Sequence, residues 1–596
     1  MRRKSLALGA VLLLLLEACG GANPSASSAP SASGPAASPS GAPSSPASSA
    51  AAGGSVSFTR FAEADMVFHP VEAQSNQYML YYLLFDTLAT LDLKDTTLQT
   101  IKPRMAESWD ISPDATTFTF HLRKDIKWHD GTPFTSKDVV YTATWAAENA
   151  NGFIGFPPAW FSLKGQAAAE KACTDAGGTD ATLCGGTAPF PGVSAPDDST
   201  VVFTLEAPDV FFLRTMVDAP SVIMPEHLLK GQTLDQINKG DFKNKTPIGT
   251  GPFKLKEIAP DQFVSFEANP DYYLGKPKLD TVFYKQVTPE TALAQLESGE
   301  LDAAFNVGAT NADPLSAVDL LNVQIVNSPG IFTLVPIVDT DADRTNWNKL
   351  FNINLKPVTV DLSDKRVRQA MYYAIDRRAI NEQLFGGRNR ILWNPPGFKE
   401  YDDMNKYEFN VDTAKSLLAA AQTDGKFDPA DPIRFMYATD LADGGKVAPI
   451  VKQQLEAAGF KVELNAVDID TYNSLATTSA TRDQYDMSFG AGGSEGLSPS
   501  RSEIYFKCGD EDPLGQSGYI NCDLRDLFKK ARTQVDPAAQ DETYHQVARI
   551  LNEDVPQMYL WQLAGVHAVN KRVQGLQVPS FERYVTIDVL DWSVTG

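Results

Sequence analysis

Residues 103–135 read PRMAESWDISPDATTFTFHLRKDIKWHDGTPFT. Within this stretch, apolar and polar side chains alternate over 117–122, which predicts a strand with one buried face. The segment 129–133 (HDGTP) is typical of a turn, because glycine adopts positive φ without strain and proline presets its own backbone angle. Thr135 is placed to cap a helix that begins near residue 137. A strand, a turn and a capped helix therefore follow one another closely.

Short motifs of the same kind continue along the chain, at 223–229 (IMPEHLL), 248–253 (IGTGPF), 269–273 (NPDYY), 275–277 (GKP), 296–302 (LESGELD), 366–370 (RVRQA) and 374–377 (AIDR). Together with residues 103–135, and in this order, they resemble the peptide/oligopeptide-binding family of solute-binding proteins that serve ABC importers. The resemblance covers essentially all of 56–596. It implies a polar ligand, an ABC permease with its ATPase as partners, and no covalent step or cofactor.

These motifs also have plain structural explanations. The glycines of 249–252 (GTGP) mark a sharp bend between strands and not a phosphate-binding loop. His129 lies in a turn, so we expect it to be structural. The charged residues of the later helical motif are expected to form surface ion pairs: Arg366, Arg368, Asp376 and Arg377. The motifs therefore identify the fold and say little about the ligand.

Hydrophobic periodicity predicts a mixed α/β protein. Alternation indicates strands and a 3.6-residue spacing indicates helices: strands at 201–205, 263–266 and 461–467, and helices at 367–375, 414–421 and 448–458. Gly459 is a natural stop for the last of these helices. Helix, glycine and strand in succession favour an α/β arrangement in the later half of the chain.

The resemblance implies a two-lobe clamp of the class II periplasmic-binding-protein type, with an extra subdomain inserted in lobe I. Lobe I would occupy 55–330, with the insertion at about 90–195, and the chain would return to it at 560–596. Lobe II would occupy 331–559. Two crossings between the lobes would leave a hinge of two strands, which permits rigid-body closure on a ligand.

The start of the chain predicts an export signal and a tether. Residues 1–18 combine a basic start with an apolar run over 6–16 that is too short to cross a bilayer. The residues before Cys19 resemble the bacterial lipobox, in which the cysteine thiol receives a lipid; a plain secretory signal is the alternative. Residues 19–54 continue as a linker that, apart from Cys19 and Asn23, consists of Gly, Ala, Ser and Pro, and we expect it to be disordered. We therefore expect an extracytoplasmic protein, lipid-anchored to the cell membrane at the cell surface or in a periplasm.

The charge balance excludes one class of partner. The chain has 52 Lys and Arg against 74 Asp and Glu, a formal net charge of −22 at pH 7. Removal of residues 1–18 would bring this to −24, because three positive charges and one negative charge are lost. Such a protein repels nucleic acid and gains nothing from anionic lipid head groups. We expect a monomeric globular body with no nucleic-acid partner.

Four further cysteines form two local pairs, Cys173 with Cys184 and Cys508 with Cys522. Each pair encloses a loop rich in Gly and Asp, which favours two disulfides in an oxidising compartment. Free thiols are the alternative. Zinc binding fits poorly, because neither pair has the short spacing of a zinc site.

One segment has the pattern of an active site. Residues 492–496 (GGSEG) match the nucleophile elbow of α/β-hydrolases, with Ser494 as nucleophile and His545 and His567 after it in the required order. That pattern needs a helix directly after the serine, and 497–500 (LSPS) reads as a loop. The six histidines are scattered without metal-binding spacing. We therefore expect no catalytic residue and no metal site.

The same segment is a candidate ligand-binding loop. In the peptide-binding family, a strand that begins with Tyr/Phe-Asp leads to a loop whose aspartate pairs with the peptide amino terminus. Counting from Tyr485 and Asp486 places Glu495 near that position, where its carboxylate would hold a cation; an exposed glutamate on a mobile loop is the alternative. Trp393 is a candidate cleft wall, with core packing as the alternative. The candidate ligand-binding residues are Glu495, Gly493, Ser494, Gly492, Trp393 and Asn394.

We therefore expect a solute-binding protein that captures peptides, or another polar solute, by hinge closure and delivers them to an ABC importer. A sensor with the same fold is one alternative, and a lipid-anchored serine hydrolase is another. Relatives of this fold take peptides, nickel chelates, oligosaccharides and other molecules. Glutamate at 495 and the absence of arginine near 489 depart from the usual peptide-binding pattern, so the ligand stays open.

Overall fold

The computed structural model describes residues 53–60, 78–95, 98–149, 159–175, 184–186, 190–395, 397–439, 443–477, 479–492, 499–506, 508 and 517–595. All of these belong to one compact unit. Cys19, most of the linker, and the loop residues Gly493, Ser494 and Glu495 lie outside these ranges. None of the helices in the described ranges has both the length and the apolar character that a membrane span requires.

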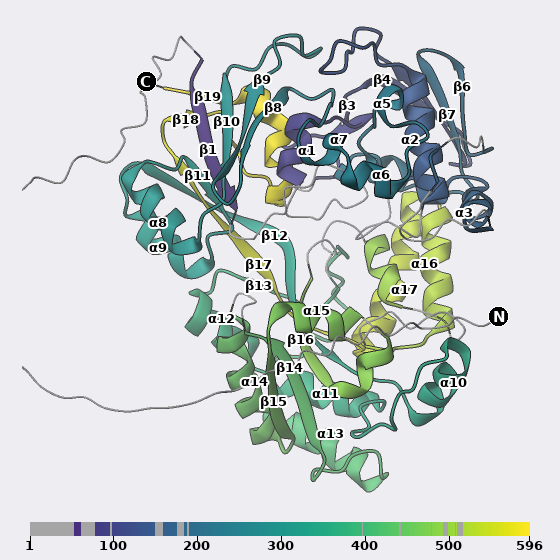
Figure 1. Cartoon of the computed structure of the whole chain (residues 1–596). Helices are drawn as coiled ribbons and strands as arrows, with labels where there is room; N and C mark the ends of the chain where they lie inside the picture. Colours follow the sequence, from purple (N-terminus) through teal and green to yellow (C-terminus); the bar gives the residue numbers. More distant parts are fainter. Residues whose placement is uncertain are drawn as a thin grey trace, which may run out of the picture. The chain divides into compact units, whose positions relative to one another are not determined.

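A mixed sheet of 11 strands runs through the described residues (Figure 1). Some neighbouring strands pair in parallel, such as Pro432–Ala438 with Lys461–Val467, and others pair antiparallel. The order is β15 (Lys461–Val467), β14 (Pro432–Ala438), β16 (Met487–Gly492), β12 (Leu321–Pro336), β17 (Met558–Asn570), β11 (Ala303–Phe305), β1 (Ser55–Arg60), β10 (Thr281–Lys285), β9 (Phe263–Ala268) and β8 (Phe253–Ala259), with β13 (Arg390–Ile391) beside β17. The prediction of a mixed α/β protein is confirmed.

The two longest strands, β12 and β17, pair antiparallel at the centre of this sheet. Their register runs to Asn327 opposite Ala564 and resumes with Ile331 opposite Gln562. Three residues of β12, 328–330, therefore face a single residue of β17, which is a bulge. Beyond the bulge β12 also pairs with β16, whereas the other end of β17 pairs with β11. The bulge thus separates the half of the sheet that holds β14–β16 from the half that holds β1 and β8–β11.

Helices cover the half of the sheet that holds β14–β16: α11 (Lys365–Ala374), α12 (Arg377–Phe385), α13 (Val411–Thr423), α14 (Gly444–Ala458) and α15 (Ile469–Thr477). Helix α10 (Asp341–Phe351) follows β12 in the chain. Helices α11, α13 and α14 confirm the three helices predicted from periodicity. Their apolar faces share one core with Phe332, Phe435 and Phe489 of the strands. Helix α14 ends at Gly459, whose φ of 112° is open to glycine and strained for other residues.

The other half of the sheet is covered by α1 (Tyr78–Leu84) and the 3₁₀ segment η9 (Glu582–Asp591). Phe58 of β1 packs edge-on against Tyr284 and Trp592, with ring centroids 5.5 and 6.3 Å apart. The backbone at Gly249 approaches α1 so closely that a Cβ atom there would lie 1.8 Å from the Leu84 carbonyl oxygen. The glycine pair in the GTGP motif therefore serves close packing of the chain onto α1.

A separate four-stranded sheet has the order β4 (Ala106–Ile111), β5 (Thr117–Leu122), β7 (Thr200–Thr204) and β6 (Val193–Asp197). It forms its own core with α2 (Ser136–Glu148). Thr135 caps α2 in a capping box with Asp138, and Gly131 has a φ of 93° in the preceding turn. The strand, turn and cap predicted within 103–135 are confirmed.

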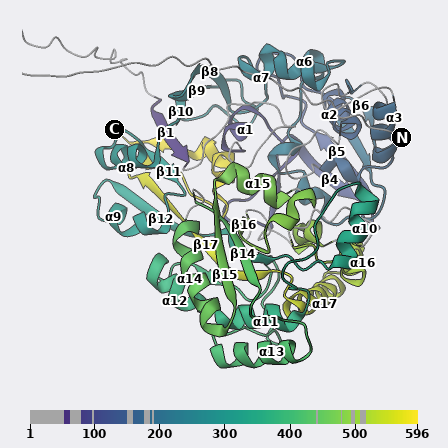
Figure 2. The ribbon, with the colours of Figure 1, turned by 60° about the horizontal axis from the view of Figure 1, so that its bottom comes forward.

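Shorter elements connect these layers (Figures 1 and 2): β2 (Ala89–Leu91), β3 (Ile101–Pro103), η3 (Ala159–Ser162), α3 (Gln166–Asp175), α4 (Phe212–Thr215), η4 (Ala219–Ser221), α5 (Glu226–Leu229), α6 (Leu234–Lys239), α7 (Asp241–Asn244), α8 (Pro289–Ser298), η5 (Ala309–Asn311), α9 (Ala312–Ser316), η6 (Ser479–Gln484), η8 (Pro499–Tyr505), β18 (Val573–Gln574) and β19 (Ser593–Val594). A helical hairpin, α16 (Cys522–Thr533) and α17 (Pro537–Asp554), has an aromatic core of its own. Helix α8 contributes Ala292 and Leu296 to the core of α11–α14. The lobe boundaries at 330 and 560 stay a prediction.

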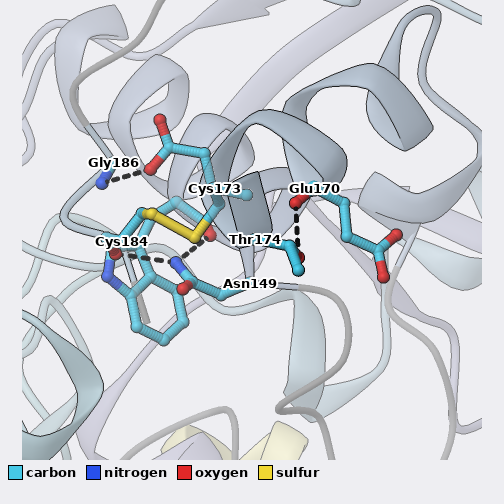
Figure 3. Close-up of a disulfide and its surroundings, with 8 residues drawn as sticks. Asn149, Glu170, Cys173, Thr174, Cys184 and Gly186 are labelled. Carbon is cyan, nitrogen blue, oxygen red and sulfur yellow. Dashed lines mark hydrogen bonds between the residues drawn. A yellow bond between two sulfur atoms is a disulfide. The ribbon is translucent and has the colours of Figure 1, made fainter. Parts of the chain in front are cut away.

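Both predicted disulfides are present, Cys173–Cys184 and Cys508–Cys522. The first ties the end of α3 to a segment that lies against α2 (Figure 3). There the Asn149 side-chain amide donates to the Cys184 carbonyl oxygen at 2.8 Å. The prediction of two local cross-links is therefore confirmed.

The expectation of surface ion pairs holds for Arg366, which contacts Asp364 and Asp424, and is wrong for two neighbours. Arg368 and Arg377 are only 3% and 4% exposed. The Arg368 guanidinium donates to backbone carbonyl oxygens of the 362–363 and 554–555 segments. The Arg377 guanidinium donates to the backbone carbonyl oxygens of Leu392, Lys406 and Tyr407. These arginines are buried because loop carbonyls, and not carboxylates, satisfy their donors.

Replacing Cys173 and Cys184 together by serine is expected to lower the free energy of unfolding by about 3 kcal/mol, because the closed loop is short and the gain comes from restricting the unfolded chain. Urea unfolding followed by circular dichroism, without reductant, would measure this change. The matched control is Thr174→Ser, which lies beside Cys173 and keeps the cross-link. Equal midpoints for the wild type and the double variant would contradict the prediction.

Candidate ligand-binding site

A cavity of about 200 Å³ lies where β13 joins the central strands. Strand β13 pairs with β17 at Gln562 and Trp561, which fixes the following segment next to the bulge between β12 and β17. The cavity is lined by Arg390, Ile391, Leu392, Trp393, Asn394, Pro395, Gly397, Phe398, Glu400 and Gln562. Two of the predicted ligand-binding residues, Trp393 and Asn394, are therefore brought together here.

Charged groups of both signs border the cavity. The Arg390 guanidinium forms an ion pair with the Glu400 carboxylate and donates to the Gln562 side-chain oxygen at 3.3 Å. The Lys406 ammonium lies 5.2 Å from the centre of the Trp393 ring, within the range of a cation–π contact. This lining offers hydrogen-bond donors, acceptors and an aromatic surface to a polar ligand.

The backbone of the Trp393 segment is firmly held, because the Asn552 side chain donates to the Trp393 carbonyl oxygen at 2.9 Å. Asn394 is only 5% exposed, and its amide nitrogen donates to the Lys399 carbonyl oxygen at 3.2 Å. In the described part of the chain, the Trp393 indole nitrogen and the Asn394 side-chain oxygen have no hydrogen-bond partner. Buried polar atoms without a partner are uncommon in folded proteins. Contact of either residue with a ligand stays a prediction.

Gly492, the third described residue of the predicted site, ends β16 opposite Ile331 of β12. Gln562 is also paired with Ile331, from the other side of β12. The end of β16 and the cavity wall are therefore attached to the same residue beside the bulge. The chain continues from Gly492 into Gly493, Ser494 and Glu495, which fall outside the described residues.

A larger cavity of about 530 Å³ lies at the opposite end of the same two strands, where Asn322, Gln324 and Asn570 contribute to its lining. Its lining includes Gln324 of β12, three residues before Asn327, where the bulge begins. We favour the smaller cavity as the ligand site because motion of the two halves of the sheet would act there. No group of three or more acidic, His or Cys side chains within the described ranges is arranged to hold a metal ion.

Comparison with known families decides the class of protein. Residues 100–511 match the family described as bacterial extracellular solute-binding proteins, family 5, middle region. The chain belongs to this family.

Individual members of the family align with this chain over most of its length. A putative ABC transporter peptide-binding protein of Brucella ovis is 29% identical over 482 residues, which are 79% of this chain and 80% of that protein. The oligopeptide-binding protein AppA of Bacillus subtilis is 26% identical over 581 residues, 95% of this chain and 94% of AppA. The structure of AppA with a nonapeptide has a TM-score of 0.70 at 23% identity and covers 91% of this chain and 99% of its own. The predicted two-lobe α/β fold is confirmed.

Three polar cavity residues of this family 5 protein were not predicted from its sequence: Arg390, Glu400 and Gln562. They surround Trp393 only after the chain folds, since Gln562 is 172 residues from its hydrogen-bond partner Arg390. No local motif marks them. Gln562 reaches the cavity through the pairing of β17 with β13, and a strand of two residues has no recognisable pattern in the sequence.

The two histidines that follow Ser494 in the hydrolase pattern have structural partners. His545, on α17, lies 2.8 Å from an Asp403 carboxylate oxygen and stacks on Tyr401. His567, in β17, is fully buried, and its Nδ1 accepts a hydrogen bond from the Asn306 backbone at 3.2 Å. Burial lowers the pKa of His567 to about 4, against the opposite effect of Glu582. Burial also lowers the pKa of His129 to about 4.

Both buried histidines make stability depend on pH. Each is neutral in the fold down to about pH 4, whereas an unfolded histidine takes up a proton near pH 6.5. Their contribution is complete above pH 6.5 and is lost as the pH falls toward 4, by up to about 3 kcal/mol for each histidine. His129→Gln is expected to flatten the fall of the urea midpoint between pH 6.5 and 4.5. His121→Gln, at a half-exposed site, is the control, and an unchanged slope in His129→Gln would contradict the prediction.

Proposed function

We propose that this chain captures a peptide, or a related polar solute, between its two lobes and delivers it to an ABC importer. The single observation that carries the proposal is the position of the 390–400 cavity at the bulge between β12 and β17. Family membership supports the solute-binding role, and the names of relatives in Brucella and Bacillus support peptides. The proposed role needs only binding and release of the solute, with no covalent step.

In this proposal lobe I comprises 55–330, with its insertion at about 90–195, and 560–596, and lobe II comprises 331–559. The crossing strands β12 and β17 then act as the hinge. Their ladder is interrupted at 328–330, where the Gly330 amide donates to the Ser328 side chain at 3.1 Å instead of to β17. A missing ladder contact lowers the cost of bending at that point, so the two halves rotate about the bulge.

Closure needs a ligand that contacts both lobes, since only a difference in affinity between the open and closed states shifts their populations. Trp393 and Asn394 would supply the lobe II side of the contact. Gly492, Gly493, Ser494 and Glu495 would form the adjacent loop, with the Glu495 carboxylate holding a cationic group such as a peptide amino terminus. The closed, loaded protein would then be recognised by the permease and its ATPase.

The proposal also includes a lipid anchor at the start of the chain. Lipid on Cys19 and the linker to residue 54 would keep a monomeric binder within reach of its importer. A chain of 35 flexible residues spans roughly 30–35 Å on average, so the body would stay near the membrane without touching it. The negative net charge of the body gives it no attraction of its own to an anionic surface.

Native mass spectrometry of the purified full-length protein tests the ligand class. We expect a set of masses that tandem fragmentation resolves into peptides. A single sugar or a metal chelate in their place would contradict the peptide proposal and leave the solute-binding role standing. A protein that copurifies with no solute and binds none would contradict both the peptide proposal and the solute-binding role.

Trp393→Ala is expected to weaken binding of the copurified peptides about tenfold, because an aromatic wall at a ligand contact contributes roughly 1–2 kcal/mol. Titration calorimetry on the ligand-free protein would measure the change. Phe427→Ala is the matched control, because Phe427 is partly buried against Phe460 and away from the cavity. Equal affinities for the wild type and Trp393→Ala would exclude Trp393 from the site.

Cys19→Ser is expected to release an otherwise folded and ligand-competent protein from the membrane, because serine cannot carry the thioether-linked lipid. Cell fractionation with immunodetection would measure the released fraction, and thermal unfolding would report the fold. Ser25→Ala in the same linker is the control. If Cys19→Ser stayed with the membrane fraction, the lipid anchor would be wrong.

A further inference from the structure

A loop that follows the four-stranded sheet contacts the helical hairpin α16–α17. It consists of Asp209, Val210 and Phe211, between β7 and α4. The Asp209 amide donates to the Ala115 carbonyl oxygen at 3.1 Å, and the Asp209 carboxylate accepts from the Phe211 amide at 2.9 Å. The loop is therefore held in shape by its own side of the molecule.

Arg532, near the end of α16, meets this loop with both its backbone and its side chain. The Val210 amide donates to the Arg532 carbonyl oxygen at 3.3 Å. The guanidinium lies 3.3 Å from an Asp209 carboxylate oxygen and 3.4 Å from a Glu503 carboxylate oxygen. One cation thus bridges a carboxylate of the inserted sheet and a carboxylate of η8, on the side of the helical hairpin.

An apolar contact lies beside this ion pair. Phe211 packs against the aromatic core of the hairpin, with its ring centroid 6.4 Å from that of Tyr544. Phe398, which lines the candidate ligand cavity, packs against the same Tyr544 at 5.7 Å. Tyr544 therefore connects Phe211 to Phe398, whose ring lines the cavity.

The burial of these groups limits how strong the contact can be. The Asp209 side chain is 7% exposed and the Arg532 side chain 42% exposed. Burial raises the pKa of the Asp209 carboxyl, and the Arg532 guanidinium acts in the opposite direction. Separation of Asp209 from Arg532 would return both charges to water. The attraction between the two charges and their rehydration on separation therefore nearly cancel. An ion pair of this exposure together with one aromatic contact favours the contacting state by about five- to tenfold.

We propose that Arg532 and Phe211 form a latch between the lobes that sets the closed fraction of the protein before any ligand binds. The latch comprises Asp209, Val210 and Phe211 on lobe I, and Arg532 and Tyr544 on lobe II. Arg532 is then a positioning residue: it touches no ligand and acts by holding Asp209. Its effect on affinity rests on the proposed solute-binding function, but its effect on the ligand-free protein does not.

A defined consequence for affinity follows from population arithmetic. Where only the closed state binds productively, the apparent dissociation constant is the intrinsic constant divided by the closed fraction. Loss of the latch lowers that fraction and weakens every ligand by the same factor. A residue that contacts ligand would instead change the affinities of different ligands by different factors.

The test measures the distance between the lobes in ligand-free, full-length protein. Spin labels at Lys245→Cys, beside α7, and at Lys415→Cys, on α13, report the open and closed populations by double electron–electron resonance. Arg532→Gln and Phe211→Ala are each expected to shift the closed-to-open ratio about fivefold toward the open state, with Arg532→Lys between wild type and Arg532→Gln. Asp209→Asn is expected to repeat the Arg532→Gln result from the other lobe.

Arg549→Gln is the matched control. It removes an exposed ion pair between α17 and Asp403, within one lobe, and leaves the latch intact. Distance distributions that match the wild type in both Arg532→Gln and Asp209→Asn, or a shift of equal size in Arg549→Gln, would overturn the proposal. A wild-type protein without a closed population would overturn it as well. If the shift occurs in a protein that binds no solute, the latch stands and the proposed function fails.

Discussion

The antiparallel pairing of β12 with β17 is the interaction on which the rest of the structure depends. These strands alone in the described sheet connect its two halves, and a slip of one residue in such a ladder would turn every side chain to the opposite face. The bulge at 328–330 changes the offset between the strands by two residues, because three residues face one. The alternation of faces is therefore kept across this bulge as far as Phe332, and a second irregularity between Phe332 and Thr333 then shifts the offset by one residue.

The core of α11–α14 extends across both halves of the sheet, because it includes Ala304 of β11 as well as Phe332 beyond the bulge. Phe332 and Trp561, just beyond the bulge, belong to the core of α11–α14, whereas Val569 belongs to the core around α1. The cavity beside Gln562 lies at this transition. In the proposed function, a ligand in this cavity would lie where bending of the sheet at the bulge closes the lobes.

The sequence predicted those features that depend on short-range patterns. Alternation located β5, β7 and β9, helical spacing located α11, α13 and α14, and local cysteine pairs located both disulfides. It did not predict that Arg368 and Arg377 are buried, because their partners are carbonyl oxygens of distant loops, which carry no side-chain signature. It predicted Trp393 and Asn394 but not Gln562, which meets them only through the pairing of β13 with β17, nor the neighbouring Arg390 and Glu400, which no local motif marks.

Phe398 gives the cavity and the latch a shared surface. Its ring lines the cavity and packs on Tyr544, against which Phe211 packs from the other lobe. In the proposed mechanism, a ligand group that filled the cavity would restrict Phe398 and, through it, the aromatic core that receives Phe211. Ligand and latch would then favour the same closed state and add their contributions there. Affinity would depend on residues that no ligand touches, so a description limited to ligand contacts would leave Arg532 out.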